Sequence, residues 1–452
     1  MPDAAHILEK FPQAVPRYTS YPTAPHFRAD AGAPLMRQLI AGLNDETPVS
    51  VYAHIPFCDK LCWFCGCHTK HTTRHAPITS YIGSLEQEIA LISERTGAMP
   101  PIGQLHLGGG SPSLLTPEDC QRLRIALEGA FVFTPDSEIS VEIDPSDVTP
   151  ETLKAMKIIG LTRASIGVQD FDEQVQQAIN RPQSFEITRD VAAALREAGI
   201  SSLNIDALYG LPLQTTQRLA RTIEKVISIA PDRVALFGYA HVPWMKKHQQ
   251  MIREEDLPGA LERFEQAELA AAMLCDAGYV KIGIDHFARP DDKLAVAART
   301  GHLRRNFQGY VTDRCNTLIG LGASSIGRFD GGYIQNIVAT GQYQTAVANG
   351  HLPAAKGFAL SADDRIRAWM IERLMCDFEI RYPALRQEFG PAAAEPYIDE
   401  ARDVAASDSE GLCETSDTSF SIPVDARPFT RIVAARFDAW LNESGARYSR
   451  AV

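Results

Sequence analysis

The recurrence of short β-rich runs, separated by helical stretches, most constrains how this chain can fold. A helix between two strands returns the chain to the same end of the sheet, so this alternation predicts parallel strands joined by βα units. The pattern fits an open or closed TIM-like barrel, whose chemistry is expected where strands end and βα loops begin. The seven runs, which span about 235 residues, are 51–55, 104–107, 138–144, 163–169, 202–208, 233–239 and 281–285.

Helix starts are marked by a capping residue followed by proline or acid. Thr116-Pro117-Glu118-Asp119 and Thr149-Pro150-Glu151 each offer a hydroxyl for free amides and a carboxylate that suits the helix dipole. A similar signal, Ser361-Ala362-Asp363-Asp364, opens a later stretch with apolar residues at helical spacing, at positions 366, 370, 374 and 378. Helices are therefore predicted to begin at all three places.

Three regions follow from these patterns. Prolines at positions 12, 16, 22 and 25 predict an extended N-terminal arm over residues 1–30. Residues 31–345 are predicted to form the α/β barrel domain. The strand rhythm stops after Asn336, so residues 346–452 are predicted to form a mostly helical C-terminal domain.

Composition excludes some functions. The 452 residues carry a net charge of −12, and no basic block is visible, which argues against nucleic acid as a partner. No run approaches the roughly 18 apolar residues of a membrane helix, and the start lacks a basic segment followed by an apolar one. A cytoplasmic protein without a membrane partner is expected, and a monomer is the simplest state.

Four of the nine cysteines fall at positions 58, 62, 65 and 67. Such clustering in a reducing compartment indicates metal or redox chemistry. The spacing Cys58-x3-Cys62-x2-Cys65 puts three thiolates on one loop and would leave one iron of a cubane cluster open, and Cys67 lies too close to Cys65 to bind the same cubane easily. The alternative is a structural zinc site, because histidines follow at positions 68, 71 and 75, but the chain has no second Cys-x2-Cys pair.

These cysteines after a strand are similar to the motif of radical S-adenosylmethionine (SAM) enzymes. The longer segment 52–67, with its Cys65-Gly66-Cys67 ending, resembles the family of oxygen-independent coproporphyrinogen III oxidases, which act in haem synthesis. The resemblance covers nearly the whole chain. It includes segments 17–23, 108–113, 167–171, 204–206, 239–241, 285–290 and 305–310.

The resemblance implies a radical SAM TIM-like, partial β/α barrel and a set of site residues. A [4Fe–4S] cluster would be held by Cys58, Cys62 and Cys65, and two SAM molecules would bind beside it. The first SAM would be lined by Tyr52, Gly109, Glu142, Ala240 and Ile326. The second would be lined by Phe64, Gly110, Ser111, Gln169, Arg181 and Asp206, and the catalytic residue Gln308 would face this SAM or the substrate.

Each assignment has a structural alternative. The glycine run at 108–110 can be a simple turn, Glu142 and Asp206 can be helix caps or members of ion pairs, and Phe64 and Ile326 can pack in the core. Without the resemblance, these alternatives would be favoured.

The implied reaction is the oxidative decarboxylation of two propionates of coproporphyrinogen III to vinyl groups. It would use a 5′-deoxyadenosyl radical from SAM, give protoporphyrinogen IX, and need an unidentified electron donor and a terminal electron acceptor. A haem-binding or haem-trafficking relative is the alternative, against which Cys67 and the second SAM set argue. Basic side chains must meet the substrate's carboxylates, and the arm is expected to lie across the barrel mouth. The candidates are Arg17, Lys246, Lys247, Arg289, Arg304 and Arg305.

Overall fold

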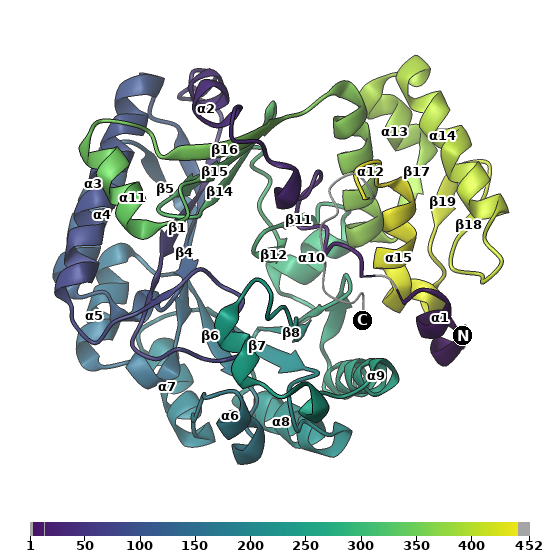
Figure 1. The fold of residues 1–452 in the computed structure, drawn as a ribbon, viewed down its shortest axis with the longest axis horizontal. Helices are drawn as coiled ribbons and strands as arrows, with labels where there is room; N and C mark the ends of the chain where they lie inside the picture. Colours follow the sequence, from purple (N-terminus) through teal and green to yellow (C-terminus); the bar gives the residue numbers. More distant parts are fainter. Residues whose placement is uncertain (1–2, 13, 442–452) are drawn as a thin grey trace.

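The main sheet forms the larger part of the molecule. The computed structural model describes residues 3–12 and 14–441, and its sheet curves around an open interior (Figure 1). The strands are β1 (Val49–Ile55), β4 (Pro101–Gly109), β5 (Val132–Ile143), β6 (Arg163–Gln169), β7 (Ser202–Tyr209), β8 (Arg233–Gly238), β9 (Val280–Ile282), β10 (His286–Ala288), β13 (Leu318–Leu321), β14 (Ile326–Phe329), β15 (Gly332–Asn336) and β16 (Ala354–Ala359). Their order is β16-β15-β14-β13-β1-β4-β5-β6-β7-β8-β10-β9.

The central strands are parallel. From β13 through β1 and β4 to β8, each strand pairs in parallel with the next, so the first six predicted strands are confirmed as βα units. The two ends of the sheet, β16 and β9, are not neighbours in the strand order. The sheet is therefore a partial barrel.

The seventh predicted strand, 281–285, is a correction. The chain forms only β9 there, turns at Gly283, whose φ is +56°, and returns as β10. β10 pairs antiparallel with both β9 and β8. A connection this short permits a hairpin but not a parallel crossover, which needs a dozen or more residues. The seventh parallel strand is instead β13, which returns to pair with β1.

Helices cover the outer face of the curved sheet (Figure 1). The predicted starts at Thr116 and Thr149 are confirmed, because each hydroxyl accepts a hydrogen bond from the backbone N–H three residues on. Between sheet and helices lies one continuous apolar core. The helices of this domain are α2 (Gly32–Ile40), α3 (Ala76–Thr96), α4 (Pro117–Glu128), α5 (Pro150–Ile159), α6 (Glu173–Ala178), α7 (Phe185–Glu197), α8 (Thr216–Ile229), α9 (Ala260–Asp276), α10 (Lys293–Arg299) and α11 (Thr340–Ala348).

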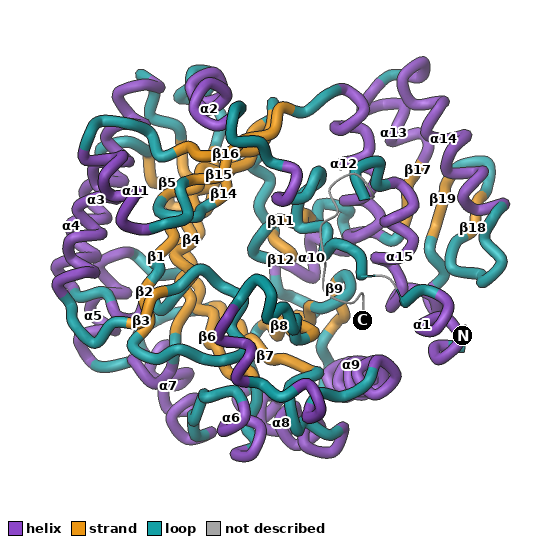
Figure 2. The backbone as a smooth tube through the Cα atoms, viewed as in Figure 1, coloured by secondary structure: helices purple, strands orange, loops and turns teal. Residues whose placement is uncertain are grey.

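The C-terminal part has its own core and is mostly helical. Ser361 caps the helix α12 as predicted, and Met370, Leu374, Tyr382 and Phe420 are fully buried together. Figure 2 shows this part as helices with one small sheet. It contains α12 (Ala362–Asp377), α13 (Tyr382–Phe389), α14 (Pro391–Ala406) and α15 (Thr430–Ala434), with β17 (Glu379–Arg381), β18 (Glu414–Thr415) and β19 (Ser419–Ser421).

Strand formation does not stop at Asn336, as the sequence pattern suggested. β16 lies beyond residue 345 and pairs antiparallel with β15, because its backbone groups find partners at the edge of the main sheet. The domain limits 31–345 and 346–452 remain predictions, and residues 442–452 lie outside the described part of the chain.

The N-terminal arm is partly helical. Asp3 accepts hydrogen bonds from the N–H groups of Ala5 and His6 and so caps α1 (Ala4–Lys10), whose Ile7 is buried in the C-terminal core. Residues 1–2 and 13 of the predicted arm lie outside the described residues. Beyond α1 the arm is irregular, and Arg17 donates to the Gly238 carbonyl at 2.7 Å, so the arm reaches the end of β8.

Candidate active site

The cysteine loop follows β1 and is fixed mainly through its backbone. Two short strands, β2 (Phe57–Cys58) and β3 (Lys70–His71), pair at its base. Side chains from two other segments donate hydrogen bonds to its carbonyl oxygens, so the loop is held in place while its thiols are left for other partners. These bonds are Asn180 to Leu61 (2.9 Å), Gln249 to Phe64 (2.9 Å), His248 to Cys65 (2.7 Å) and Lys246 to Cys67 (3.0 Å).

The three predicted cluster ligands are half-buried neighbours with different electrostatic surroundings. Burial raises the pKa of Cys58 to about 12, and the Cys65 and Cys62 thiols add to the effect. Burial also raises the pKa of Cys62, although Arg181, whose Nη1 lies 3.5 Å from Cys62 Sγ, opposes it. A hydrogen bond with Cys67 lowers the pKa of Cys65 to about 7. The loop therefore favours a thiolate most at Cys65.

The loop fits an iron–sulfur cluster in its chemistry. It offers three soft thiol ligands, and beside them Arg181 has a buried Nε without a hydrogen-bond partner among the described residues. In the described part of the chain, no three His, Cys, Asp or Glu side chains are grouped at the spacing of a single bound metal ion. A cubane cluster does not require such convergence, because each cysteine binds a different iron.

The glycine run at the end of β4 is more than a turn. Gly109 has a φ of +108°, and a Cβ there would lie 2.3 Å from the His54 ring. A Cβ at Gly110 would lie 2.5 Å from the Phe57 carbonyl oxygen. The backbone of β4 thus comes too close to β1 and to the cysteine loop for any side chain. Ser111 hydrogen-bonds Asp147 and Ser113.

Glu142, at the end of β5, faces the interior of the barrel. Its Oε2 accepts the Gly109 N–H at 2.9 Å, and its Oε1 lies 3.2 Å from His106 Nε2. Burial by itself would raise the pKa of Glu142, but the His106 contact and the Gly109 N–H hold it below its usual value. The side chain is 40% exposed, so an ionised carboxylate with accessible lone pairs points into open space.

Asp206, on β7, is the second inward carboxylate. It accepts hydrogen bonds from Ser165 Oγ at 2.8 Å and Asn204 Nδ2 at 2.7 Å. Burial raises its pKa, with Glu142 adding to the effect. Gln169, at the end of β6, takes the positive φ of 69°, an uncommon conformation for a residue with a side chain.

A cavity of about 510 Å³ lies inside the barrel mouth. Gln308, between β11 (Arg304–Asn306) and β12 (Gly309–Val311), contributes a buried Oε1 without a hydrogen-bond partner among the described residues. Gly66 and Cys67 border the cavity, which places it beside the cysteine loop. The predicted site residues that line it are Phe64, Glu142, Gln169, Asp206, Ala240 and Gln308.

Other predicted site residues, such as Tyr52 and Arg181, do not line the cavity but contact residues near it. Tyr52 donates toward His54 Nδ1 at 2.9 Å and stacks on His106, which does line the cavity. Arg181 bonds Asp144 Oδ2 at 2.8 Å, beside Cys62. Ile326, at the start of β14, packs against the small apolar cluster of Phe27, Tyr333 and Phe358 and does not line the cavity. The position of Ile326 agrees with the packing alternative.

The predicted basic residues separate into two groups. Arg17 and Arg305 line the cavity, whereas Arg304 is paired with Glu372 at 3.0 Å and Arg289 lies over the Tyr279 ring. Lys246 and Lys247 do not line it either, and Lys246 bonds the cysteine loop. Arg17 comes from the arm, as expected for a segment at the barrel mouth.

Sequence reasoning missed several polar residues of the cavity floor. Ser165 lies four residues before Gln169 on β6, and Asn204 lies two before Asp206 on β7, so the strand alternation could have found these two. Arg163 pairs with Glu138 and Arg233 with Asp292, so both cations have partners. The missed lining residues include Arg163, Ser165, Asn204, Arg233 and His286.

Comparisons with known proteins agree with this geometry. A model of the radical SAM superfamily matches residues 52–226. The oxygen-independent coproporphyrinogen III oxidase of Cereibacter sphaeroides is 48% identical over 98% of both chains, and that of Bradyrhizobium diazoefficiens is 44% identical over 97% of this chain and 98% of its own.

A solved structure extends the agreement to three dimensions. Coproporphyrinogen III oxidase (HemN) of Escherichia coli, described as a radical SAM enzyme, is 37% identical to this chain. The TM-score is 0.90, with 97% of this chain and 100% of the other covered. The cysteine loop, the inward carboxylates and these full-length likenesses agree, and the chain belongs to the family of oxygen-independent coproporphyrinogen III oxidases.

Proposed function

We propose that this chain catalyses the oxygen-independent oxidative decarboxylation of two propionates of coproporphyrinogen III, which gives protoporphyrinogen IX in haem biosynthesis. The observation that carries the proposal is the cavity itself. Glu142, Asp206 and the Oε1 of Gln308, which has no hydrogen-bond partner among the described residues, lie near the cysteine loop, and Arg17 and Arg305 are also in the lining. A substrate with four carboxylates needs such cations, since the chain as a whole is acidic.

Cys58, Cys62 and Cys65 would hold the [4Fe–4S] cluster. When bound, the cluster and SAM supply a 5′-deoxyadenosyl radical that removes a hydrogen atom from the β-carbon of a propionate. The chain's own groups would orient the reactants. Glu142 can accept hydrogen bonds from the amino group or ribose of SAM, and the close backbone of β4 brings its N–H and carbonyl groups within reach.

Binding of a second SAM is part of the proposal. Phe64, Gln169 and Asp206 line the same cavity at the ends of other strands, and Asp206 is a carboxylate whose pKa burial raises. Arg181 would act beside the cysteine loop, because its guanidinium bonds Asp144 and contacts Cys62. The cysteine loop and Gln308 would close the substrate off from water.

Three further parts of the proposal concern partners and place. An electron donor and a terminal electron acceptor are required, since removal of a hydrogen atom and carbon dioxide leaves one electron to be accepted at each propionate. A cytoplasmic location and a monomeric state are also proposed. In the described residues, no helix has the length and apolar character needed to cross a membrane.

The test is an anaerobic assay of the reconstituted protein. Coproporphyrinogen III, SAM, a reductant and cell extract as a source of acceptor are supplied, and tetrapyrrole products are separated by chromatography. Protoporphyrinogen IX is expected with the wild type and not with Cys62→Ala. SAM cleavage without any decarboxylated tetrapyrrole would contradict the proposal and favour the haem-trafficking alternative.

A further inference from the structure

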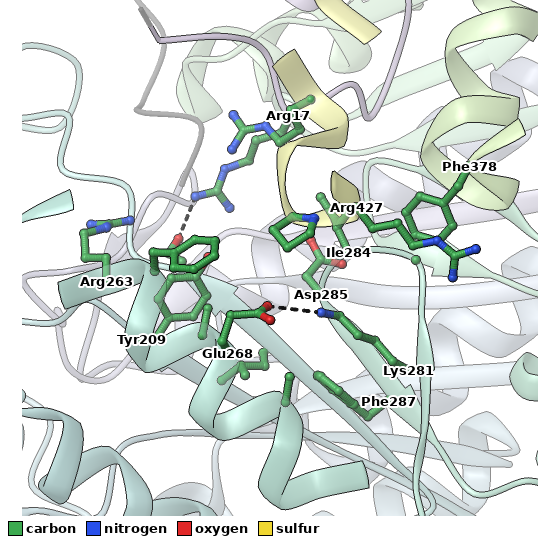
Figure 3. Close-up of a pocket in the computed structure, with 18 of the residues that line it drawn as sticks. Arg17, Tyr209, Arg263, Glu268, Lys281, Ile284, Asp285, Phe287, Phe378 and Arg427 are labelled. Carbon is green, nitrogen blue, oxygen red and sulfur yellow. Dashed lines mark hydrogen bonds and ion pairs between the residues drawn. The ribbon is translucent and has the colours of Figure 1, made fainter. Parts of the chain in front are cut away.

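A second cavity, of about 410 Å³, lies between the barrel and the C-terminal part. Its walls come from α9, from β9 and the turn that follows it, and from η6 (Val424–Phe429). Figure 3 shows Arg17, Arg263 and Arg427 around this space, with the Lys281–Glu268 pair below them. It shares Arg17, Gly238 and Arg305 with the main cavity, so the two spaces adjoin.

The lining carries an excess of positive charge. Six basic side chains stand against the acids Glu268, Asp285 and Asp425. Glu268 is paired with Lys281 at 3.5 Å, and Asp285 with Arg305 at 3.4 Å. The basic residues are Arg17, Arg263, Lys281, Arg305, Arg427 and Arg431.

Several of these arginines donate hydrogen bonds to backbone carbonyl oxygens. Arg17 donates to the carbonyl oxygen of Gly238, and Arg431 to those of Pro16 and Val15. Arg427 lies 4.4 Å above the Phe378 ring, and its buried Nε has no hydrogen-bond partner among the described residues. The buried Nε of Arg305, a residue only 6% exposed, has none either. Buried N–H donors such as these two Nε groups are normally hydrogen-bonded, so an acceptor from a bound ligand would satisfy them.

The electrostatics of these arginines favour the binding of an anion among them. Burial lowers the pKa of Arg431 to about 9, and the charge of Arg17 contributes. Burial lowers the pKa of Arg17 too, with Arg305 adding to the effect. Cations that disfavour one another in this way are stabilised when a carboxylate binds between them.

We infer that this second cavity binds the carboxylates of the two propionates that the reaction leaves in place. The inference rests on the proposed function. No residue of the cysteine loop lines the second cavity, so a carboxylate held there is remote from the reacting carbon. Arg17 and Arg305, which belong to both cavities, mark where the macrocycle would pass from one to the other. The site is thus a positioning device that presents the opposite side of the substrate to the cluster.

The test compares two porphyrins on the reconstituted holoenzyme by fluorescence titration. Coproporphyrin III has four carboxylates, whereas deuteroporphyrin IX retains only the two propionates that the reaction spares. Arg427→Gln is expected to weaken both by about tenfold, because each would lose one charge-assisted contact. SAM cleavage without substrate should not change. Arg427→Lys should restore most of the affinity.

A second variant guards against misfolding caused by loss of the Phe378 contact. Lys281→Gln leaves the contact between Arg427 and Phe378 in place and removes the cation paired with Glu268, so it is expected to weaken both porphyrins by about threefold. Lys154→Gln, at an exposed position on α5, is the matched control. Unchanged binding in the Arg427 and Lys281 variants, or a loss limited to coproporphyrin, would overturn the inference. If wild-type protein binds both porphyrins but decarboxylates neither substrate propionate, the proposed function fails and the site stands.

Discussion

The two cavities differ in how their charges are handled. Around the main cavity, the inward acids have partners: Glu142 bonds His106 and Gly109, and Asp206 bonds Ser165 and Asn204. Cations outnumber acids in both linings, but Arg163 and Arg233 of the main cavity are paired with acids, whereas Arg427 of the second cavity has a buried Nε without a hydrogen-bond partner among the described residues. Inward carboxylates beside the cysteine loop suit the ammonium group of SAM, and unsatisfied cations suit the carboxylates of the substrate. This difference suits a substrate whose spared carboxylates bind in the second cavity while its reacting propionate lies in the main cavity beside the cysteine loop.

The largest expected effect tests whether the cysteine loop beside the main cavity holds the reactive centre. Cys65→Ala removes a cluster ligand and is expected to abolish SAM cleavage and the visible absorption of the reconstituted cluster. Cys275→Ala, at an exposed thiol on α9, is the control and should keep both. A Cys65→Ala protein that still cleaves SAM would show that the reactive centre lies elsewhere.

Ionisation of Glu88, a buried residue that lines neither cavity, should lower the stability of the fold. Glu88, only 1% exposed, accepts hydrogen bonds from Tyr343, Asn336 and the Gly322 N–H. Burial raises its pKa from 4.5 to about 7. The folded state therefore binds more protons than the unfolded state between these values, so the free energy of unfolding falls as pH rises, by on the order of 3 kcal/mol.

Denaturant unfolding at pH 5 and pH 8 measures this effect. The stability of Glu88→Gln should fall less than that of the wild type between the two pH values, because its side chain cannot ionise. Glu128→Gln, on the outer surface, should behave as the wild type. Equal losses in wild type and Glu88→Gln would show that Glu88 does not titrate in this window.

Glu142→Gln tests whether the inward carboxylate of the main cavity binds SAM. The change removes the negative charge that would receive the SAM amino group or ribose, so the KM for SAM is expected to rise by about ten- to a hundredfold. Cluster absorption should stay the same. Asp190→Asn, at an exposed position on α7, is the control and should leave the KM for SAM unchanged. A Glu142→Gln enzyme with an unchanged KM for SAM would remove Glu142 from the SAM site.

The smallest expected effect is that of Arg17→Gln, which acts where the cavities meet. Loss of one guanidinium should raise the KM for coproporphyrinogen III by about tenfold at most and leave the KM for SAM unchanged. Arg28→Gln, exposed in the same arm, provides the control. A parallel rise in both KM values would mean that Arg17 supports the whole barrel mouth, and the distinction between the two sides would fail.

Local patterns in the sequence predicted much of the parallel sheet and the cysteine loop. The strands through β8 and the caps Thr116, Thr149 and Ser361 depend on neighbouring residues, so the chain displays them directly. The β9–β10 hairpin was mistaken for a parallel strand because the turn at Gly283 interrupts an otherwise regular run. The helix α1 was missed because prolines farther along the arm outweighed its short apolar pattern.

Long-range assembly could not be predicted in the same way. β13 pairs with β1 although more than half of the chain separates them, and the second cavity unites Arg17, Arg305 and Arg427 from three distant segments. No spacing rule links such residues. The family resemblance located most of the site, yet the position of Ile326 depends on packing that only the structure shows.

The most direct measurement follows one hydrogen atom. Coproporphyrinogen III labelled with deuterium at the β-carbons of its propionates is incubated with reconstituted enzyme, SAM and reductant, and the 5′-deoxyadenosine formed is analysed by mass spectrometry. Deuterium in the 5′-deoxyadenosine, together with vinyl products, is the predicted result. SAM cleavage that yields only unlabelled 5′-deoxyadenosine would contradict the account, because the radical would then not act on the propionate.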